Sequence, residues 1–170
     1  MAVIADYDPA WPDLAAAAIA ELRAALPHTI VEIEHIGSTA VPGLAAKPVI
    51  DLMAAVASLD TVDTAAIERL EYRRYFNGMQ DRLLYVREKA QRRTHILHVV
   101  TLESWPTRNQ RILRDYLRRN PADAERYAQL KRQIAGLPGY SGHKTPLIQE
   151  LTDRARAERG LPSVPVWEKG

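Results

Sequence analysis

Hydrophobic and polar residues alternate along several short stretches of the first hundred residues, and these stretches are rich in β-branched residues. A period of two places successive side chains on opposite faces of a strand, so the pattern is typical of β-structure. Turn-forming or charged residues separate the stretches, as in the dipeptide Asn77-Gly78. Strands are therefore predicted at residues 30–36, 49–56, 72–76, 83–87 and 94–101, the last two as a hairpin.

The remaining segments are predicted to be helical, because proline stands near their starts and proline or glycine follows their ends. An alanine-rich helix is predicted at residues 14–26, and a second one at 61–71 with Asp60 or Thr61 as its N-cap. Three more helices are predicted after residue 104: 105–119 capped by Ser104, 121–136 after Asn120-Pro121, and 145–160 from Thr145-Pro146. The chain is thus expected to form one α/β domain, residues 1–170, with a helical C-terminal half.

Composition excludes several kinds of chemistry. The chain has no cysteine, which rules out disulfides, thiolate metal sites and cysteine nucleophiles. Its first residues do not show a basic segment followed by an apolar one, and no stretch is long and apolar enough to be a membrane span. A cytoplasmic protein without a membrane partner is therefore expected.

Charge is unevenly distributed along the chain. Residues 1–100 carry 10 lysines and arginines against 13 acidic residues, whereas residues 101–170 carry 13 against 8. The basic C-terminal part is either a set of solvated helix faces or a wall that attracts polyanions such as nucleotides. Nucleic acid is not the expected partner, because only Trp105, Tyr116 and Tyr127 lie near these arginines, and nucleic-acid sites usually interleave basic and aromatic residues.

The segment 31–56 contains the strongest candidate for a functional site. A predicted strand ends directly before Gly37-Ser38, and Asp51 lies inside the next apolar run. Glycine lets the backbone approach an anion closely, serine adds a hydroxyl to backbone N–H donors, and aspartate is a hard oxygen ligand for Mg²⁺. The alternative is structural: Ser38 would be an N-cap, and Asp51 would form a salt bridge with Lys47 or an arginine.

The same segment resembles the central signature of the GrpB-like family, which belongs to the nucleotidyltransferase superfamily. The sixteen residues IEHIGSTAVPGLAAKP at 33–48, followed by Ile50-Asp51, carry the resemblance. It extends nearly end to end through further motifs: YDPAWP at 7–12, RTH at 93–95, LHV at 97–99, DYL at 115–117, and residues 127–131. A contiguous signature of this length is specific. The resemblance implies a polymerase-β-like fold, in which helices flank a small mixed β-sheet.

The resemblance also implies a set of carboxylates, and here the chain departs from it. The superfamily pattern has two carboxylates at alternate positions of the strand after the Gly-Ser turn and a third on a neighbouring strand. Alternate residues face the same side and together hold metal ions that bind a triphosphate and activate an acceptor hydroxyl. Asp51 is present, but the residue two positions on is Met53, a poor ligand for Mg²⁺. The strand at 94–101 contains no acid and offers His95 and His98 instead.

Other residues are candidates to complete a metal or catalytic site beside Asp51. His98 would replace a carboxylate as a ligand, act as a general base, or be a hydrogen-bonded core residue. His95 lies three positions away and is expected on the opposite face of the strand. Glu34 is a candidate second metal ligand or a solvent-facing strand residue, because alternation does not tell which face of its strand meets Asp51.

Four residues near the turn and the hairpin are candidates for phosphate binding. His35 would bind a phosphate or brace the loop, and Thr39 would assist Ser38. Lys47 would neutralise the charge of a triphosphate, or be solvated or paired with Asp51. One or two arginines around the hairpin are expected to face the phosphates, and Arg93 is the candidate. The arginines in question are Arg82, Arg87, Arg92 and Arg93.

Functions of different classes are therefore expected. The first is a nucleotide-binding enzyme resembling nucleotidyltransferases: Gly37-Ser38 cradle the phosphates, Asp51 holds Mg²⁺, His98 or a glutamate completes the site, and a nucleoside monophosphate passes to a small-molecule acceptor. The second is a noncatalytic module that binds a nucleotide or a CoA-like phosphate in the same cleft. Met53 favours the module, and relatives of the family occur fused to dephospho-CoA kinase. A third alternative is a metal-dependent phosphohydrolase built around Asp51 and the histidines.

Overall fold

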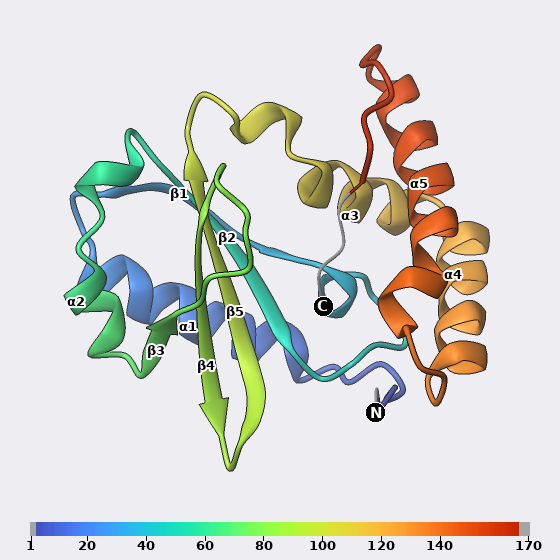
Figure 1. Ribbon diagram of the computed structural model, residues 1–170, viewed down its shortest axis with the longest axis horizontal. Coiled ribbons are helices and arrows are strands. Elements are labelled where there is room, and N and C mark those ends of the chain that lie inside the picture. Colours follow the sequence, from blue (N-terminus) through green and yellow to red (C-terminus); the bar gives the residue numbers. More distant parts are fainter. Residues whose placement is uncertain (1–2, 167–170) are drawn as a thin grey trace.

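A five-stranded mixed sheet lies at the centre of the first hundred residues (Figure 1). The computed structural model of the chain describes residues 3–166, apart from the side chain of Ser141. The strand order is β1-β2-β5-β4-β3; β2 and β5 are parallel, and the other neighbours are antiparallel. The strands are Ile30–Ile36 (β1), Ile50–Val56 (β2), Tyr72–Arg74 (β3), Leu83–Lys89 (β4) and Arg92–Thr101 (β5).

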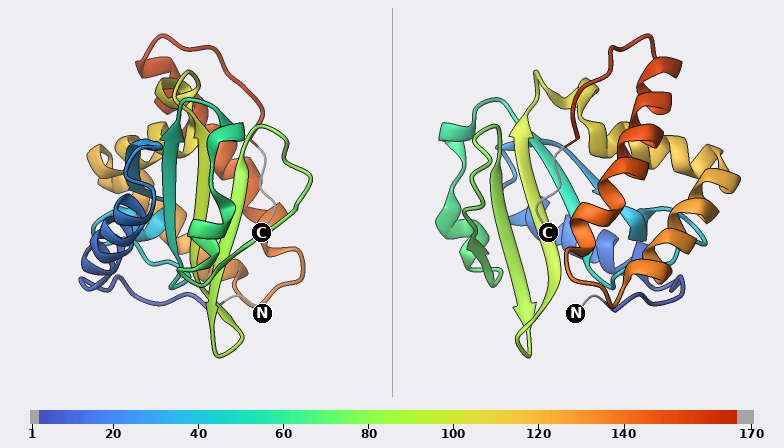
Figure 2. Two further views of the ribbon diagram at one scale, coloured as in Figure 1. Left: turned by 90° about the vertical axis from the view of Figure 1, so that its left-hand side faces the viewer. Right: turned by 45° about the vertical axis from the view of Figure 1, so that its right-hand side comes forward.

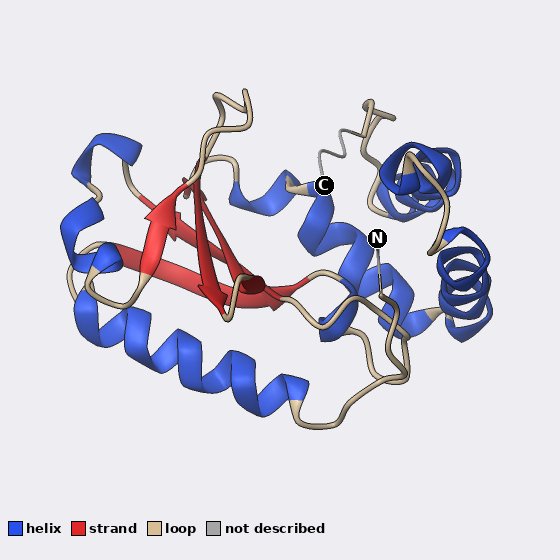
Figure 3. Ribbon diagram, turned by 60° about the horizontal axis from the view of Figure 1, so that its bottom comes forward, coloured by secondary structure: helices blue, strands red, loops and turns tan. Residues whose placement is uncertain are grey.

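Helices cover one face of the sheet and form a separate group beside it. The helices α1 (Trp11–Ala25) and α2 (Thr64–Glu68) pack on one face, as Figure 3 shows for α1. The helices α3 (Asn109–Arg119), α4 (Pro121–Ile134) and α5 (Tyr140–Glu158) lie together on the other side of the molecule (Figure 2). This confirms the predicted α/β class, a small mixed sheet flanked by helices with a helical C-terminal part.

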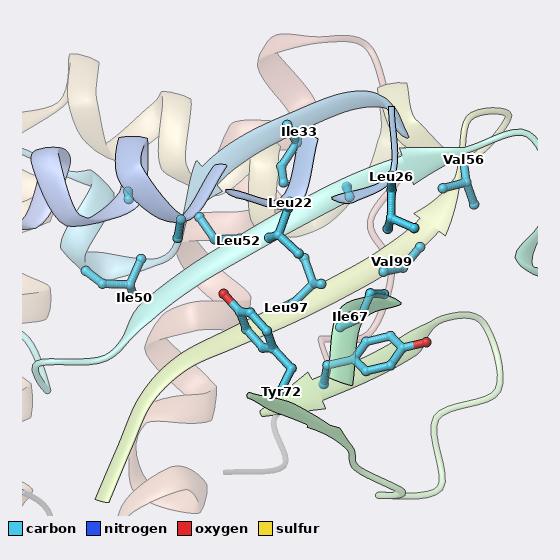
Figure 4. Packing of buried hydrophobic residues seen from close by; sticks show 14 of the residues in the cluster. Leu22, Leu26, Ile33, Ile50, Leu52, Val56, Ile67, Tyr72, Leu97 and Val99 are labelled. Atoms are coloured by element: carbon cyan, nitrogen blue, oxygen red, sulfur yellow. The ribbon is translucent and has the colours of Figure 1, made fainter. Parts of the chain in front are cut away.

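Two large hydrophobic cores and a smaller one around Met53 and Trp105 follow from this arrangement. The first lies between α1 and the sheet, where Leu22, Leu52 and Leu97 are fully buried (Figure 4). The second joins α3, α4 and α5 to the segment after β1, through Val41, Leu44 and Ala45. Because that segment is part of a core, the Gly-Ser turn just before it is held by packing on both sides.

The predicted helix at 61–71 begins later, because its N-cap is Asp63 and not Asp60 or Thr61. The Asp63 carboxylate accepts a hydrogen bond from the Ala66 amide at 3.2 Å. Each of these short polar residues can cap a helix, so the sequence alone does not choose among them.

The predicted helix at 105–119 is also broken. Residues Trp105–Thr107 form a 3₁₀ turn, and Arg108 then has an extended backbone with ψ of 122°. The Arg108 guanidinium donates to the Asp81 carboxylate at 2.6 Å, which ties this point of the chain to the loop before β4. A tertiary contact therefore sets the start of α3.

The last helix starts at Tyr140 and contains Pro146 in its interior. Gly139 precedes it in a left-handed conformation with φ of 72°. Proline removes one helical hydrogen bond, but Ile148 and Leu151 pack into the C-terminal core and stabilise the helix across it. Proline is therefore not the start signal that the sequence suggested.

Replacing Tyr72 with phenylalanine is expected to stabilise the protein. Tyr72 is 2% exposed, and within the described part of the chain its hydroxyl has no hydrogen-bond partner. Its removal should raise the free energy of unfolding by about 1 kcal/mol, because an unpaired buried hydroxyl is costly. Tyr85→Phe is the matched control: the Tyr85 hydroxyl lies 2.7 Å from Thr64 Oγ1, so its loss should lower stability. Urea unfolding measures both, and equal signs for the two variants would contradict the expectation.

None of the helices within residues 3–166 has the length and the apolar character that crossing a membrane requires.

Candidate functional site

The Gly-Ser turn lies directly against Asp51. In the β1–β2 ladder Ile36 pairs with Asp51, so the turn leaves β1 beside the start of β2. Gly37 has φ of 76°, and a β-carbon placed on it would lie 2.8 Å from Asp51 Oδ2. Both the backbone conformation and the space beside the carboxylate therefore require glycine. The predicted grouping of Gly37, Ser38 and Asp51 is present.

These residues line a cavity of about 310 Å³ between the uncovered face of the sheet and the C-terminal helices. Its walls come from the Gly-Ser turn, from β2, β4 and β5, and from α3, α4 and α5. Of its lining residues Asp51 alone is acidic, whereas five are lysines or arginines. The basic residues are Lys47, Arg82, Arg93, Lys131 and Lys144. Such a wall favours a ligand with several negative charges.

Lys131 is a functional candidate that sequence reasoning missed. It projects from α4, is 3% exposed, and donates hydrogen bonds to Ser38 Oγ and, at 3.2 Å, to the Ala45 carbonyl. Its ammonium also lies 4.1 Å from the centre of the Tyr127 ring. A buried ammonium thus reaches the Gly-Ser turn from a helix far along the chain.

His98 lies next to Asp51 and is held by Arg82. Its Nε2 is 4.0 Å from Asp51 Oδ1, and its Nδ1 is 3.1 Å from the Arg82 guanidinium. Arg82 in turn donates to Asp81 at 3.1 Å, and Asp81 also binds Arg108. Burial alone would raise the pKa of Asp81, but hydrogen bonds from the two arginines lower it to about 2. Arg108, Asp81 and Arg82 are therefore all charged, and this series of contacts ends at His98.

His98 itself is neutral in this environment. Burial, followed by the positive charges of Arg82 and Arg108, lowers its pKa to about 3. Because a guanidinium only donates, Nδ1 must accept and the remaining proton is on Nε2, facing Asp51. His98 is thus placed as a hydrogen-bond donor, and the predicted general-base role would require Arg82 to release Nδ1.

A β-bulge brings Arg93 into the cavity. Arg93 and His95 are two positions apart on β5, but the residues that they pair with on β4 are adjacent. Thr94 is therefore the extra residue of the bulge. Arg93 lines the cavity and its guanidinium lies 4.7 Å from the Tyr75 ring centre. Beyond the bulge the alternation is regular, so His95 lies on the α1 side against Tyr72, opposite to His98. Arg82 and Arg93 are thus the arginines of the hairpin region that face the cavity.

His35 and Thr39 brace the turn from behind. His35 Nε2 lies 2.8 Å from Thr39 Oγ1, and the Thr39 hydroxyl is 3.5 Å from the Val49 carbonyl before β2. Burial, followed by the charges of Arg118 and Arg114, lowers the pKa of His35 to about 4. Of the two roles considered for His35, this geometry corresponds to bracing the loop.

Glu34 is not brought into the cavity with Asp51. Its carboxylate binds Arg111 at 2.8 Å and Arg114 at 3.0 Å, which joins β1 to α3. Burial raises the pKa of Glu34, but the two arginines outweigh it and the pKa is lowered overall. Residues 3–166 contain no group of three histidine or acidic side chains placed to hold a metal ion. A metal-binding role remains a prediction for Asp51 and for Glu34, but the structure does not bring the two together.

Two signals in the sequence could have indicated Lys131. The buried residues Ala124, Tyr127 and Ala128 repeat along α4 at helical spacing and so lie on one face. Lys131 and Ile134 continue the same face. A lysine on an apolar face is unusual unless it has a specific partner. Lys131 also closes the 127–131 motif, to which no role was assigned.

Aromatic rings and lysines meet at the mouth of the same cavity. The ammonium of Lys47 lies 4.3 Å from the Tyr140 ring centre, and that of Lys144 lies 5.1 Å from it. Lys47, which the sequence proposed as a phosphate ligand, therefore lines the cavity beside the start of α5. An aromatic ring between cations provides contacts for both a planar and a charged part of a ligand.

Comparison with known proteins identifies the family to which this arrangement belongs. The family described as "GrpB protein" matches residues 1–154, so the chain belongs to the GrpB family, as its signature predicted. A UPF0157 protein of Halalkalibacterium halodurans is 32% identical over 162 residues, 89% of this chain and 81% of the relative. The crystal structure of conserved protein GrpB from Enterococcus faecalis superposes with a TM-score of 0.84 at 30% identity, covering 93% of this chain and 99% of the other. A dephospho-CoA kinase of Mycobacterium tuberculosis is 45% identical over 62 residues, 35% of this chain and 15% of the kinase.

Proposed function

We propose that the cavity binds a nucleoside triphosphate together with Mg²⁺ and that the protein transfers the nucleoside monophosphate to a small-molecule acceptor. One observation carries the proposal: five basic side chains and a single carboxylate meet at a Gly-Ser turn in one cavity. With His98 neutral, the lining has a net charge of +4, which suits a triphosphate. Such ligands are cytoplasmic, in keeping with the location predicted from the sequence.

The residues present fit a magnesium ion that is shared with the ligand. Mg²⁺ in nucleotide sites is commonly bound by one or two carboxylates and completed by phosphate oxygens and water. Asp51 supplies one such carboxylate, and His98 does not compete for the ion because Nε2 carries its proton. The bound ion would neutralise charge that develops on the phosphates during transfer.

Different residues of the cavity would bind different parts of the ligand. The backbone at Gly37 approaches a phosphate without a side chain in the way, and Ser38 Oγ is already oriented by Lys131. Lys131 and Arg93 compensate phosphate charge from opposite sides of the cavity. His98 faces the Asp51 carboxylate with its Nε2 at 4.0 Å from Oδ1, a separation too long for a direct hydrogen bond.

Calorimetric titration with ATP, CTP, GTP and UTP, each with and without Mg²⁺, tests the proposal. At least one triphosphate should bind, and more tightly with Mg²⁺. Asp51→Asn keeps the shape of the side chain and should abolish the effect of Mg²⁺. Asp63→Asn is the control, because Asp63 caps α2 on the far side of the sheet. The proposal fails if no triphosphate binds under either condition.

Removing the charge of Lys131 is expected to weaken triphosphate binding 10- to 100-fold. Lys131→Met keeps the long stem of the side chain but removes the ammonium that orients Ser38 Oγ and that would meet a phosphate, and a hydrogen bond to a charged group contributes about 1.5–3 kcal/mol. Arg132→Met is the matched control, since Arg132 points away to Asp6 at the surface. It should change the dissociation constant less than twofold. Equal losses in the two variants would show that general charge, and not the buried ammonium, determines affinity.

The second candidate is a noncatalytic module for a nucleotide or a CoA-like phosphate. Met53 favours it: this residue is fully buried and packs with Val100 and Trp105. The position at which the superfamily pattern has a second carboxylate is therefore part of a hydrophobic core. Titration with CoA and dephospho-CoA discriminates between the candidates. Tight binding of either that needs no Mg²⁺ and persists in Asp51→Asn would favour the module over the transferase.

A further inference from the structure

A second cavity of about 340 Å³ adjoins the first one. It lies between the loop before β4, the start of α3, one face of α5 and the segment 164–166. The two cavities share part of their lining, but the contacts of Arg82 and Arg108 with Asp81 stand between the two spaces. The second cavity is therefore a separate place in which a molecule could bind.

Specific contacts hold the wall that segment 164–166 forms. The Gln149 side chain on α5 donates to the Val164 carbonyl at 2.9 Å and accepts from the Val166 amide at 2.9 Å. Both groups of one side-chain amide are thus used to fix the backbone of this segment against the helix. The wall on this side of the cavity is therefore part of the packed fold.

Arg156 on α5 carries a buried positive charge without a carboxylate partner. The residue is only 6% exposed. Its guanidinium donates to the Pro162 carbonyl at 2.6 Å, to the Thr107 carbonyl at 3.2 Å and to Asn109 Oδ1 at 2.8 Å, and all three acceptors are uncharged. Within residues 3–166 it forms no ion pair with an acidic side chain. Buried charges are costly unless an opposite charge compensates them, so Arg156 is an exception that needs a reason.

One nitrogen of this guanidinium is open to the second cavity. The three hydrogen bonds use Nε and Nη1, whereas Nη2 donates to no residue that the structure describes. Protein atoms do not enclose Nη2 completely, and Arg156 lines the second cavity but not the first. The accessible side of Nη2 therefore opens toward this space. Guanidinium N–H groups form their strongest hydrogen bonds with anionic oxygens such as those of a carboxylate.

The rest of the lining shows what else the ligand should carry. Arg82 and Arg108 both bind the Asp81 carboxylate, so of the three arginines in the lining only Arg156 lacks an acidic partner there. Several other lining residues are apolar, namely Leu113, Ile148, Val164, Pro165 and Val166. A molecule with one negative charge and an apolar body suits this cavity, whereas the more basic first cavity suits a polyanion.

We infer that the second cavity is a binding site for a small monocarboxylate with an apolar body, and that its carboxylate pairs with Arg156. The carboxylate supplies the counter-charge that the guanidinium lacks, and the apolar body covers the side chains beside it. Binding stabilises the folded protein, because the unfolded chain has no such cavity. The inference does not depend on the proposed nucleotidyl transfer, since this ligand carries no phosphate and lies away from the Gly-Ser turn.

Titration of the ¹⁵N-labelled full chain with phenylacetate tests the inference, with phenylacetamide as the uncharged counterpart of the same shape. Phenylacetate should shift the amide resonances of Leu113, Thr152 and Arg156 and raise the melting temperature. Phenylacetamide should bind at least about tenfold more weakly, because a hydrogen bond between charged groups is lost. Inorganic phosphate should also bind at least about tenfold more weakly than phenylacetate, since it gains nothing from the apolar surface.

Replacing the arginine locates the binding on the helix. Arg156→Met should weaken phenylacetate binding at least about tenfold, because it removes the charged donor. Arg154→Met is the matched control: Arg154 lies two positions away on α5 and pairs with Asp123 and Glu150, so its loss should change the affinity less than about twofold.

A second pair of variants leaves Arg156 and its structural hydrogen bonds in place. Val164→Asp adds a carboxylate to the lining of the cavity and should weaken phenylacetate binding about tenfold by competition and repulsion. Val164→Asn has the same shape without the charge and should bind phenylacetate at least about tenfold more tightly than Val164→Asp. This pair decides the question even if Arg156→Met does not fold.

Several outcomes would overturn the inference. They are equal binding of phenylacetate and phenylacetamide, phosphate binding as tight as that of phenylacetate, equal losses in Arg156→Met and Arg154→Met, and equal affinities of the two Val164 variants. Resonance shifts centred on Gly37 and Ser38 would place the carboxylate in the first cavity and would also overturn it. So would a titration with phenylacetate that shifts no resonance of α5.

Discussion

A Gly37→Ala variant is expected to bind magnesium and nucleotide about 100-fold more weakly than the wild-type protein while remaining folded. The added methyl group would lie 2.8 Å from Asp51 Oδ2, closer than β-carbons approach other atoms, and 3.2 Å from Asp51 Cβ, which is a tight contact. Either the turn or the carboxylate must move, and a 100-fold loss of affinity corresponds to about 2.7 kcal/mol, the size of one lost hydrogen bond to a charged group. Calorimetric titration with a triphosphate and Mg²⁺ measures the loss.

Gly43→Ala separates this collision from ordinary backbone strain. Gly43 has φ of 82°, close to that of Gly37, but nothing lies within 4 Å of a β-carbon placed on it. Both variants should lose stability from backbone strain, on the order of 1–3 kcal/mol, and Gly37→Ala should lose more because ψ of −173° at Gly37 lies in a region that essentially only glycine adopts. Only Gly37→Ala should lose the ligand. If the two variants bind equally well, Asp51 does not depend on the glycine beside it.

The second large effect is a loss of stability in mild acid. His35, His95 and His98 are neutral when folded: burial comes first and nearby arginines second in lowering the pKa of His35 and His95 to about 4 and that of His98 to about 3. An unfolded histidine titrates near 6.5. Stability is thus fully present above pH 6.5 and declines as the pH falls toward 4, because the unfolded chain binds protons that the folded chain does not.

Each histidine contributes at most about 1.4 kcal/mol per pH unit to this slope, and solvent screening makes the share of His35 smaller. Urea unfolding between pH 7.5 and 4.5 measures it. The carboxylates with lowered pKa, Glu34 and Asp81 among them, add to the loss only near the lower end of this range, because their ordinary pKa values are 4.5 and 3.8. His98→Asn should remove about one third of the slope. Constant stability between pH 7 and 5 would show that these histidines take up protons equally in the folded and the unfolded chain.

The sequence predicted the strands and the grouping of Gly37-Ser38 with Asp51, because both depend on local pattern. Alternation located β1, β2, β4 and β5, and the distance from Gly37-Ser38 to Asp51 is bridged by a single antiparallel pairing. Local pattern could not determine which partner the Glu34 carboxylate binds. The register places it opposite Met53 and thus on the same face as Asp51, yet the arginines of α3 bind its carboxylate. Which partner a charged group takes is decided by elements distant in the chain.

The same limit explains why Lys131 and Arg82 received no specific role. Lys131 reaches Ser38 from 93 positions along the chain, and only the packing of α4 against the segment after β1 brings them together. Arg82 was one of four arginines of equal appearance, and its contact with His98 selects it. The starts of α1, α2, α3 and α5 were displaced: α1 begins at Trp11 and not at Leu14, and for the other three helices tertiary contacts or alternative caps override short sequence signals.

The parallel pairing of β2 with β5 also bears on the order in which the molecule folds. The ladders β1–β2 and β4–β5 join strands near in sequence, whereas residues 57–91 separate β2 from β5. Pairing across so long a loop is slower than hairpin formation, because the entropy of closing the loop is lost before any contact is gained. Gly37 meets Asp51 within the first ladder, but Asp51 meets His98 only across the β2–β5 pairing. We therefore expect the turn to acquire its shape early in folding and the carboxylate to acquire its histidine neighbour among the last contacts formed.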